Sequence, residues 1–184
     1  MMSVMTFDRR QFLQSGTAAV VALLGQGCAV PGTAPSSVLG FASVPATLRD
    51  AVTVPPGYIA QVLYPWGSPT GIAGAMPVFA SDASNSAADQ SMQAGMHHDG
   101  MHFFPLGTGS ERGLLVMNHE YTDEQLLHTD GVTHWTAEKV RKSLHAMGVS
   151  VIEIERRPEG WRQVLPSPYA RRVHGNTSMR ISGP

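Results

Sequence analysis

Three histidines and one aspartate lie within six residues of one another in the segment 95–104, which reads Gly-Met-His-His-Asp-Gly-Met-His-Phe-Phe. A second polar segment, 118–123, reads Asn-His-Glu-Tyr-Thr-Asp. Neutral imidazole and carboxylate groups bind hard and borderline metal ions, and they also carry protons near neutral pH. The two segments therefore predict a metal site or an acid–base site. The alternative is a set of polar loop residues that bond to the backbone.

The candidate metal ligands are histidines and carboxylates of these two segments: His97, His98, Asp99, His119 and Glu120, with His102 and Asp123 as further candidates. Their spacing identifies no particular metal, because no His-Glu-x-x-His motif is present and ligands on strands or loops have no diagnostic spacing. It also assigns no catalytic role to any one of them. The single cysteine, Cys28, lies in the N-terminal leader, so a cysteine nucleophile and a thiolate metal site are excluded for the rest of this chain.

Arg171 and Arg172 are the candidate phosphate-binding residues, because paired arginines can hold a phosphate through parallel hydrogen bonds. The alternative is a solvated basic turn. Charge is unevenly placed along the chain: residues 1–134 have four arginines and ten carboxylates, a net of −6, and residues 135–184 have nine cationic residues and four carboxylates, a net of +5. This asymmetry indicates either two solvated faces or a basic region that meets an anionic substrate.

A β-hairpin is the element that would bring the two polar segments together. Residues 101–104 and 113–117 are short apolar runs typical of buried strands, and a Pro- and Gly-containing turn, 105–109, lies between them. The outer ends of an antiparallel hairpin meet. We therefore expect His97, His98 and Asp99 to lie near His119 and Glu120.

The remaining pattern predicts a mainly β fold with one inserted helix. The chain of 184 residues is long enough for one domain, and its 19 glycines and 13 prolines favour strands and turns. Further strands are expected at 58–64, 149–155 and 161–165, and 67–95 reads as a long loop, functional or flexible. Thr136 and Gly148 are expected to begin and close the helix, whose apolar face is Ala137, Val140, Leu144 and Met147.

The first 34 residues are predicted to be an export signal. Arg9, Arg10, Phe12 and Leu13 closely resemble the twin-arginine signal of bacteria, and they precede an apolar run, 17–24, that is too short to span a bilayer. The expected partner is the twin-arginine translocase, and the expected location is the periplasm or the medium. Cleavage and lipidation at Cys28 are both left open. A linker at 35–50 and a domain at 51–184 follow, with no stable membrane span and, at a net charge of −1, no sign of nucleic-acid binding.

The chain resembles the N-terminal part of PhoX-type alkaline phosphatases. Two stretches carry the resemblance most clearly: 95–106, the His-rich segment followed by Pro-Leu, and 112–123, Arg-Gly-Leu-Leu-Val-Met-Asn-His-Glu-Tyr-Thr-Asp. Further matching stretches are 51–64, 135–143, 148–153, 169–172, 175–177 and 181–184. The resemblance implies a phosphomonoesterase on a six-bladed β-propeller, with calcium and iron at the end of the central channel. Asp99, His119 and Glu120 would then line the channel, since carboxylate oxygens suit calcium.

Members of that family are several times longer, and their iron-binding cysteine comes after the point that matches residue 184. A six-bladed propeller needs about 24 strands at four per blade, and this sequence supplies about five to eight. We therefore expect an N-terminal fragment of a secreted phosphatase that is inactive by itself. The alternatives are a non-catalytic exported propeller that binds a ligand or partner, and a metal-dependent phosphodiesterase or lactonase on a propeller.

Overall fold

The computed structural model describes residues 40–183, so the predicted leader, with Arg9, Arg10, Phe12 and Leu13, lies outside the described residues. The chain divides into two compact units, the first ending at Ile59 and the second beginning at Ala60. The described part of the first unit, 40–59, has no helix or strand, and Phe41 packs edge-to-face on Tyr58 at 5.6 Å between ring centroids. All the helices and strands described below belong to the second unit.

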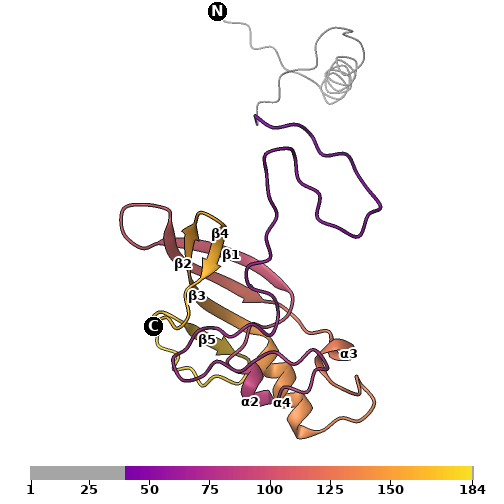
Figure 1. Ribbon diagram of the computed structural model, residues 1–184. Helices are drawn as coiled ribbons and strands as arrows, with labels where there is room; N and C mark the ends of the chain where they lie inside the picture. Colours follow the sequence, from indigo (N-terminus) through magenta and orange to yellow (C-terminus); the bar gives the residue numbers. More distant parts are fainter. Residues whose placement is uncertain (1–39, 184) are drawn as a thin grey trace, which may run out of the picture. The chain divides into compact units, whose positions relative to one another are not determined.

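A five-stranded antiparallel sheet is the main element of the second unit (Figure 1). Its strands are β1 (His98–Pro105), β2 (Arg112–His119), β3 (Gly148–Arg157), β4 (Gly160–Gln163) and β5 (Arg171–His174). They follow the order β1-β2-β3-β4, and β5 pairs with the first half of β3 beside β4 on the same edge. The prediction of a mainly β fold is confirmed. Within residues 40–183 the sheet is open, and a propeller is not established by it.

The predicted hairpin is confirmed, with β1 and β2 paired from His98 opposite His119 to Pro105 opposite Gly113. The predicted burial of the first strand is wrong, because most side chains of β1 are exposed. β1 is the edge of the sheet in the described part of the chain, and only β2 pairs with it. The predicted strand at 149–155 and its return strand at 161–165 correspond to β3 and β4, although β4 ends at Gln163.

Residues 58–64 do not form the predicted strand. Alternating β-branched and aromatic residues favour a strand only where a neighbouring strand supplies hydrogen-bond partners, and this segment pairs with none within residues 40–183. Ile59 and Val62 are exposed, whereas Tyr64 is buried. The segment therefore contributes one anchoring side chain to the second unit instead of a sixth strand.

α4 (Ala137–Ala146) is the predicted helix, and the Thr136 hydroxyl accepts a hydrogen bond from the Lys139 amide at 3.2 Å, as expected of its N-cap. The predicted apolar face is wrong: Val140 is 49% exposed, and the buried residues of α4 are Lys142, Ser143, His145 and Ala146. This face is buried because it packs on two short helices that the sequence did not predict, α2 (Ala87–Gln90) and α3 (Glu124–Leu127). Their contacts with α4 include polar side chains.

The end of α4 also differs from the expectation of a glycine cap. The last carbonyls of a helix lack partners within the helix and need donors from elsewhere. Here the Leu144 carbonyl accepts from the Gly175 amide at 2.8 Å, and the Ala146 carbonyl accepts from the Met96 amide at 3.0 Å. Gly148, with a φ of +113°, begins β3 instead. Tertiary contacts therefore satisfy this helix end.

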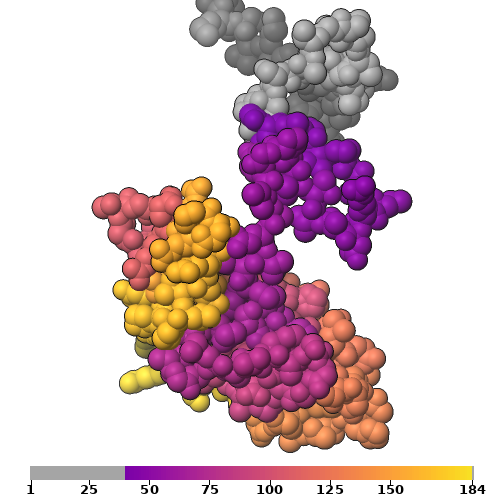
Figure 2. All heavy atoms as spheres, viewed as in Figure 1, coloured from indigo at the N-terminus to yellow at the C-terminus, as the bar shows by residue number. Residues whose placement is uncertain are grey.

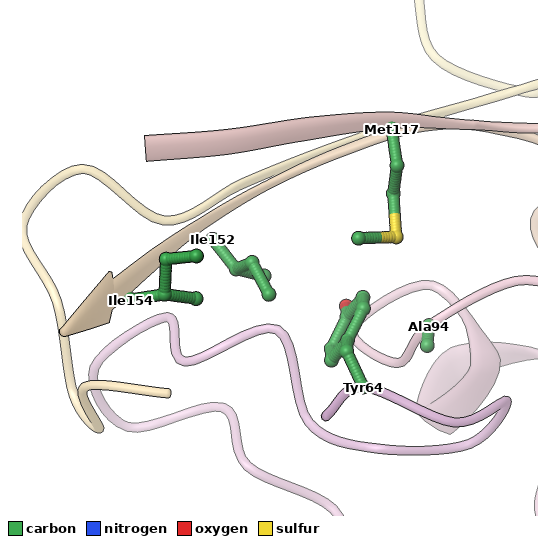
Figure 3. Packing of buried hydrophobic residues seen from close by; sticks show 5 residues of the cluster. All are labelled: Tyr64, Ala94, Met117, Ile152 and Ile154. Carbon is green, nitrogen blue, oxygen red and sulfur yellow. The ribbon is translucent and has the colours of Figure 1, made fainter. Parts of the chain in front are cut away.

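The core lies between the sheet and the segment that precedes it. Met117 from β2 and Ile152 and Ile154 from β3 point toward Tyr64 and Ala94 (Figure 3). The segment 60–95 lies over part of the sheet (Figure 2). Although 67–95 is mostly irregular, as predicted, several of its residues are fully buried and its path is set by packing: Thr70, Ala87, Gln90, Gln93 and Ala94. No helix formed by residues 40–183 has the length and apolar character needed to cross a membrane.

We expect Ile152→Ala to lower the free energy of unfolding by about 2–5 kcal/mol, because Ile152 has no exposed surface and its truncation leaves a cavity under β3. Val140→Ala is the control, with an expected change within about 0.5 kcal/mol at an exposed position. Urea denaturation of both variants measures the difference. Equal costs at the two positions would contradict the packing of α4 and β3 described above.

Candidate functional site

A buried polar cluster lies where the β1–β2 hairpin ends. His119, the last residue of β2, is 1% exposed, and its Nε2 lies 2.7 Å from the Ser150 hydroxyl on β3. The Tyr64 hydroxyl donates to the same Ser150 oxygen at 3.3 Å and lies 3.1 Å from the Thr70 hydroxyl. β2, β3 and the segment before the sheet thus meet through side-chain hydrogen bonds that no local sequence pattern indicates.

His98 completes this cluster, and the hairpin register brings it to His119 as predicted. The two imidazole rings meet edge to face with centroids 4.7 Å apart, and the His98 ring also stacks on Tyr64 with centroids 5.9 Å apart. Gly95 is required here, since a Cβ at this position would collide with the Ala146 carbonyl and the His119 side chain. Within residues 40–183 His98 Nε2 and His119 Nδ1 are both enclosed without a hydrogen-bond partner.

Arg172, on β5, joins four parts of the chain. The residue is 8% exposed. Its guanidinium donates from Nε to the Gln93 carbonyl at 2.9 Å and from Nη2 to the His145 and Met147 carbonyls at 2.6 and 3.1 Å. Nη1 donates to the Val173 and Val149 carbonyls at 2.7 and 3.3 Å. The His145 and Met147 carbonyls end α4, where the helix dipole favours a cation.

Each nitrogen of Arg172 faces a carbonyl and the side chain is buried, so the predicted binding of phosphate by Arg172 would require some of these bonds to break. Arg171, its neighbour, is exposed and donates from Nη1 to the Pro168 and Ala170 carbonyls at 2.8 and 2.7 Å. Its role as a phosphate ligand stays a prediction. The alternation of β5 places one arginine inside and the next outside, which the sequence did not distinguish.

Burial and the charge of Arg172 control protonation in the cluster. Burial, then Arg172, then His98, lower the pKa of His119 to about 3. Burial is also the main cause that lowers the pKa of His98, and burial raises the pKa of Tyr64. Both imidazoles are therefore neutral near neutral pH, and Tyr64 is un-ionised. The cluster acts as a neutral, hydrogen-bonded support and not as a charged acid–base pair.

The exposed side of the hairpin end carries the remaining candidates. His97 has a left-handed φ of +47°, its ring stacks on Tyr121 with centroids 3.7 Å apart, and its carbonyl accepts from the Glu120 amide at 3.0 Å. Asp99 and Glu120 are exposed, and neither side chain has a hydrogen bond or ion pair within the part of the chain that the structure describes. Left-handed backbone at a non-glycine residue costs about 1–3 kcal/mol and is concentrated at functional sites.

Two further candidates lie elsewhere. His102 is exposed on β1 and packs edge to face on Phe104 at 4.6 Å. Asp123 caps α3 by accepting from the Gln125 amide at 3.1 Å. The hairpin therefore gathers five of the seven candidates at one end and leaves these two outside the gathering.

The donor types at this end fit oxygen coordination better than nitrogen coordination. The carboxylates of Asp99 and Glu120 are accessible, and carboxylate oxygens suit a hard cation such as calcium. The unpartnered nitrogens of His98 and His119 are enclosed. Among residues 40–183 no group of three histidine, cysteine, aspartate or glutamate side chains stands close enough to hold a metal.

A second polar cluster was not predicted from the sequence. Glu124 Oε2 lies 2.8 Å from His128 Nε2 and accepts from the Ser143 hydroxyl at 2.8 Å, and Thr122 donates to the other carboxylate oxygen. The i, i+4 spacing of Glu124 and His128 was the one local signal for it. Glu124, His128 and Ser143 fasten α3 to α4. His128 also lines a hollow of about 280 Å³, together with Lys139 and Lys142.

Comparisons with known proteins relate this chain to one enzyme family. The model of the family described as alkaline phosphatase PhoX matches residues 39–184. A solved structure of Pseudomonas fluorescens PhoX in complex with vanadate, a transition state analogue, is similar with a TM-score of 0.72 and 42% sequence identity. The similarity covers 78% of this chain and 24% of that one, so the chain spans about a quarter of the PhoX chain. A search of curated proteins found no match.

We expect Arg172→Met to lower the free energy of unfolding by about 3–5 kcal/mol, because a buried side chain loses its hydrogen bonds to five carbonyls on four segments. Arg171→Met is the matched control, and its exposed side chain gives an expected cost of about 1 kcal/mol or less. Chemical denaturation of the two variants decides. Similar costs for both would show that the buried contacts of Arg172 are not what holds β5.

We expect the chain to lose stability as the pH falls from about 6.5 toward about 4. Burial, then His145 and Arg172, lower the pKa of His174 to about 4, and the pKa of His119 is lower still. In that window the unfolded chain binds more protons than the folded chain, so acid favours unfolding. Unfolding midpoints across this pH range measure the loss.

His174→Asn should make that pH dependence shallower, because it removes one of the imidazoles whose pKa is lowered in the folded chain. His134→Asn is the control at an exposed side chain and should leave the slope unchanged. An unchanged slope in His174→Asn would show that the lowered pKa of His174 does not contribute to the acid sensitivity.

Proposed function

Because the chain belongs to the PhoX family of alkaline phosphatases, we propose that it forms part of a secreted, metal-dependent enzyme that hydrolyses phosphate monoesters. The single observation that carries this proposal is the 42% identity and TM-score of 0.72 with a PhoX solved in complex with vanadate. A transition state analogue binds where an enzyme stabilises the reacting group. The likeness thus supports phosphoryl chemistry over a purely ligand-binding propeller.

The sheet is compatible with one blade of the proposed six-bladed propeller. In β1-β2-β3-β4 each strand pairs with the next strand along the chain, and a propeller blade is a four-stranded sheet beside a central channel. β1 is the exposed edge strand of this meander, and it begins beside Asp99 and the polar hairpin end. We propose that β1 faces the central channel, where the family resemblance implies that the metals bind.

Calcium and iron are the proposed cofactors, and the described residues fit the oxygen ligands that calcium prefers. When bound, such ions offset the negative charge that develops on the phosphoryl oxygens. Asp99 and Glu120 are the residues that we propose to bind or orient them. Two contacts hold this end of the hairpin in place: the hydrogen bond from the Glu120 amide to the His97 carbonyl, and the buried contact of His119 with Ser150.

Export through the twin-arginine pathway is part of the proposal. Residues 1–34 would be the signal, with Arg9 and Arg10 as its paired arginines, and 35–50 would link it to the phosphatase segment at 51–184. The substrate would then be hydrolysed in the periplasm or outside the cell.

A chimera tests the function directly. Residues 40–184 replace the aligned segment of Pseudomonas fluorescens PhoX, and hydrolysis of p-nitrophenyl phosphate is compared with that of bis(p-nitrophenyl) phosphate. We expect the chimera to prefer the monoester and to lose activity to a chelator. Preference for the diester, or full activity after chelation, would refute the proposal.

In the chimera, Asp99→Asn and Glu120→Gln should each lower activity by about tenfold or more, since they replace charged oxygen ligands. Glu159→Gln, at an exposed turn between β3 and β4, is the matched control and should behave as the parent. Wild-type rates in both variants would remove Asp99 and Glu120 from the site.

The 184-residue chain purified by itself should release no p-nitrophenol with calcium and iron present. It spans 24% of the PhoX chain that binds vanadate, and the proposed centre draws on the rest. Turnover above that of the metal-containing buffer would show that this segment holds a complete site.

A further inference from the structure

The chain contains two aspartyl–glycyl pairs, Asp99-Gly100 and Asp130-Gly131, which the fold treats differently. An aspartate followed by glycine can cyclise, because the glycine nitrogen reaches the aspartate carboxyl carbon and no Cβ blocks the approach. Local freedom to bend the chain favours the reaction, and a hydrogen bond donated by the glycine nitrogen opposes it. A comparison of the two pairs therefore shows where the folded protein permits it.

Asp99 and Gly100 form a β-bulge on the edge strand β1. His98 pairs with His119 and Met101 pairs with Met117, so the two residues between them face Asn118 alone and neither has a partner in the strand register. A bulge leaves its extra residue outside the regular ladder. Both residues are exposed, and the space beside the Gly100 Cα is open, with no atom within 4 Å of where a Cβ would lie.

Asp130 and Gly131 are held in place. The Gly131 amide donates to the His128 carbonyl at 3.0 Å, and the residue is buried against Gln125. The Asp130 carboxylate forms an ion pair with Lys139, and that contact lowers the pKa of Asp130. The nitrogen is occupied and the carboxylate is kept ionised, which is the less reactive form of the carboxyl group.

We propose that Asp99-Gly100 is a site of spontaneous isoaspartate formation in the folded protein, and that Asp130-Gly131 is protected. The Gly100 nitrogen loses its proton to solvent and attacks Cγ of Asp99. A C–N bond forms, the bond from Cγ to the protonated carboxyl oxygen breaks, and one water leaves. Hydrolysis of the succinimide at the main-chain carbonyl adds the water back, and the backbone then runs through Cβ and Cγ of residue 99.

The change would fall at the candidate site. Isoaspartate lengthens the main chain by one carbon between His98 and Gly100, and its negative charge lies on the carboxylate formed from the former main-chain carbonyl of residue 99. The bulge already departs from the register of β1, so the added length can be taken up there with the pairing from Met101 to Pro105 kept. The proposal itself does not depend on phosphatase activity.

The test ages the intact 184-residue chain at neutral pH, in buffer and in concentrated urea. Isoaspartate is measured with protein isoaspartyl methyltransferase and is located by mass-spectrometric fragmentation. In buffer, residue 99 should convert several-fold faster than residue 130. In urea the two rates should converge, because unfolding removes the bond to Gly131 and the ion pair of Asp130.

Two variants sharpen the result. Gly100→Ala has room for its Cβ and should fold, and its conversion at residue 99 should be several-fold slower; Asp99→Glu should abolish conversion there, because glutamate would need a larger ring. Circular dichroism checks that both variants are folded. Equal rates at residues 99 and 130 in buffer, or conversion at residue 99 only in urea, would overturn the proposal.

Discussion

The guanidinium of Arg172 is the constraint on which the second unit depends. A buried cation is costly unless several acceptors surround it, and here carbonyls from α4, the segment before β1, and strands β3 and β5 supply them. Two of these carbonyls end a helix, where the dipole is negative and the acceptors lack partners within the helix. One side chain thus caps α4 and ties β5 to the segment that leads into the hairpin.

The contacts of Arg172 also determine the position and the protonation of the polar residues at the hairpin end. The Met96 amide bonds to the Ala146 carbonyl beside the Arg172 contacts, so the start of the His-rich segment is fixed to the end of α4. His98 and His119 are packed against this frame, and burial together with the nearby positive charge keeps them neutral. The groups left exposed are the carboxylates of Asp99 and Glu120 and the ring of His97, which stacks on Tyr121. His98 and His119 thus support the hairpin end, and the carboxylate oxygens of Asp99 and Glu120 are accessible as ligands.

Local sequence signals predicted the elements well wherever neighbours in the chain decide the outcome. The turn between β1 and β2 sets their register, and the Thr136 hydroxyl begins α4 through a bond three residues away. The meeting of His98 and His119 followed from that hairpin alone. The same reasoning failed for 58–64 and for the face of α4, since a strand requires a partner and a buried face is chosen by what packs on it. Lys142 and His145 are buried because α2 and the segment before it offer them carbonyls, from Ala83 and Ala87.

The sequence by itself determined the family, the β-rich character, the hairpin and the gathering of five candidate residues at its end. Those features depend on residue types at short spacing, which constrain the backbone directly. Only the tertiary structure decided that Arg172 is buried while Arg171 is exposed, that Ser150 bonds to His119, and that the imidazoles are enclosed while the carboxylates remain accessible. Each of these depends on acceptors and packing from segments tens of residues apart, and the cost of burying a charge or an imidazole cannot be offset until those segments are in place.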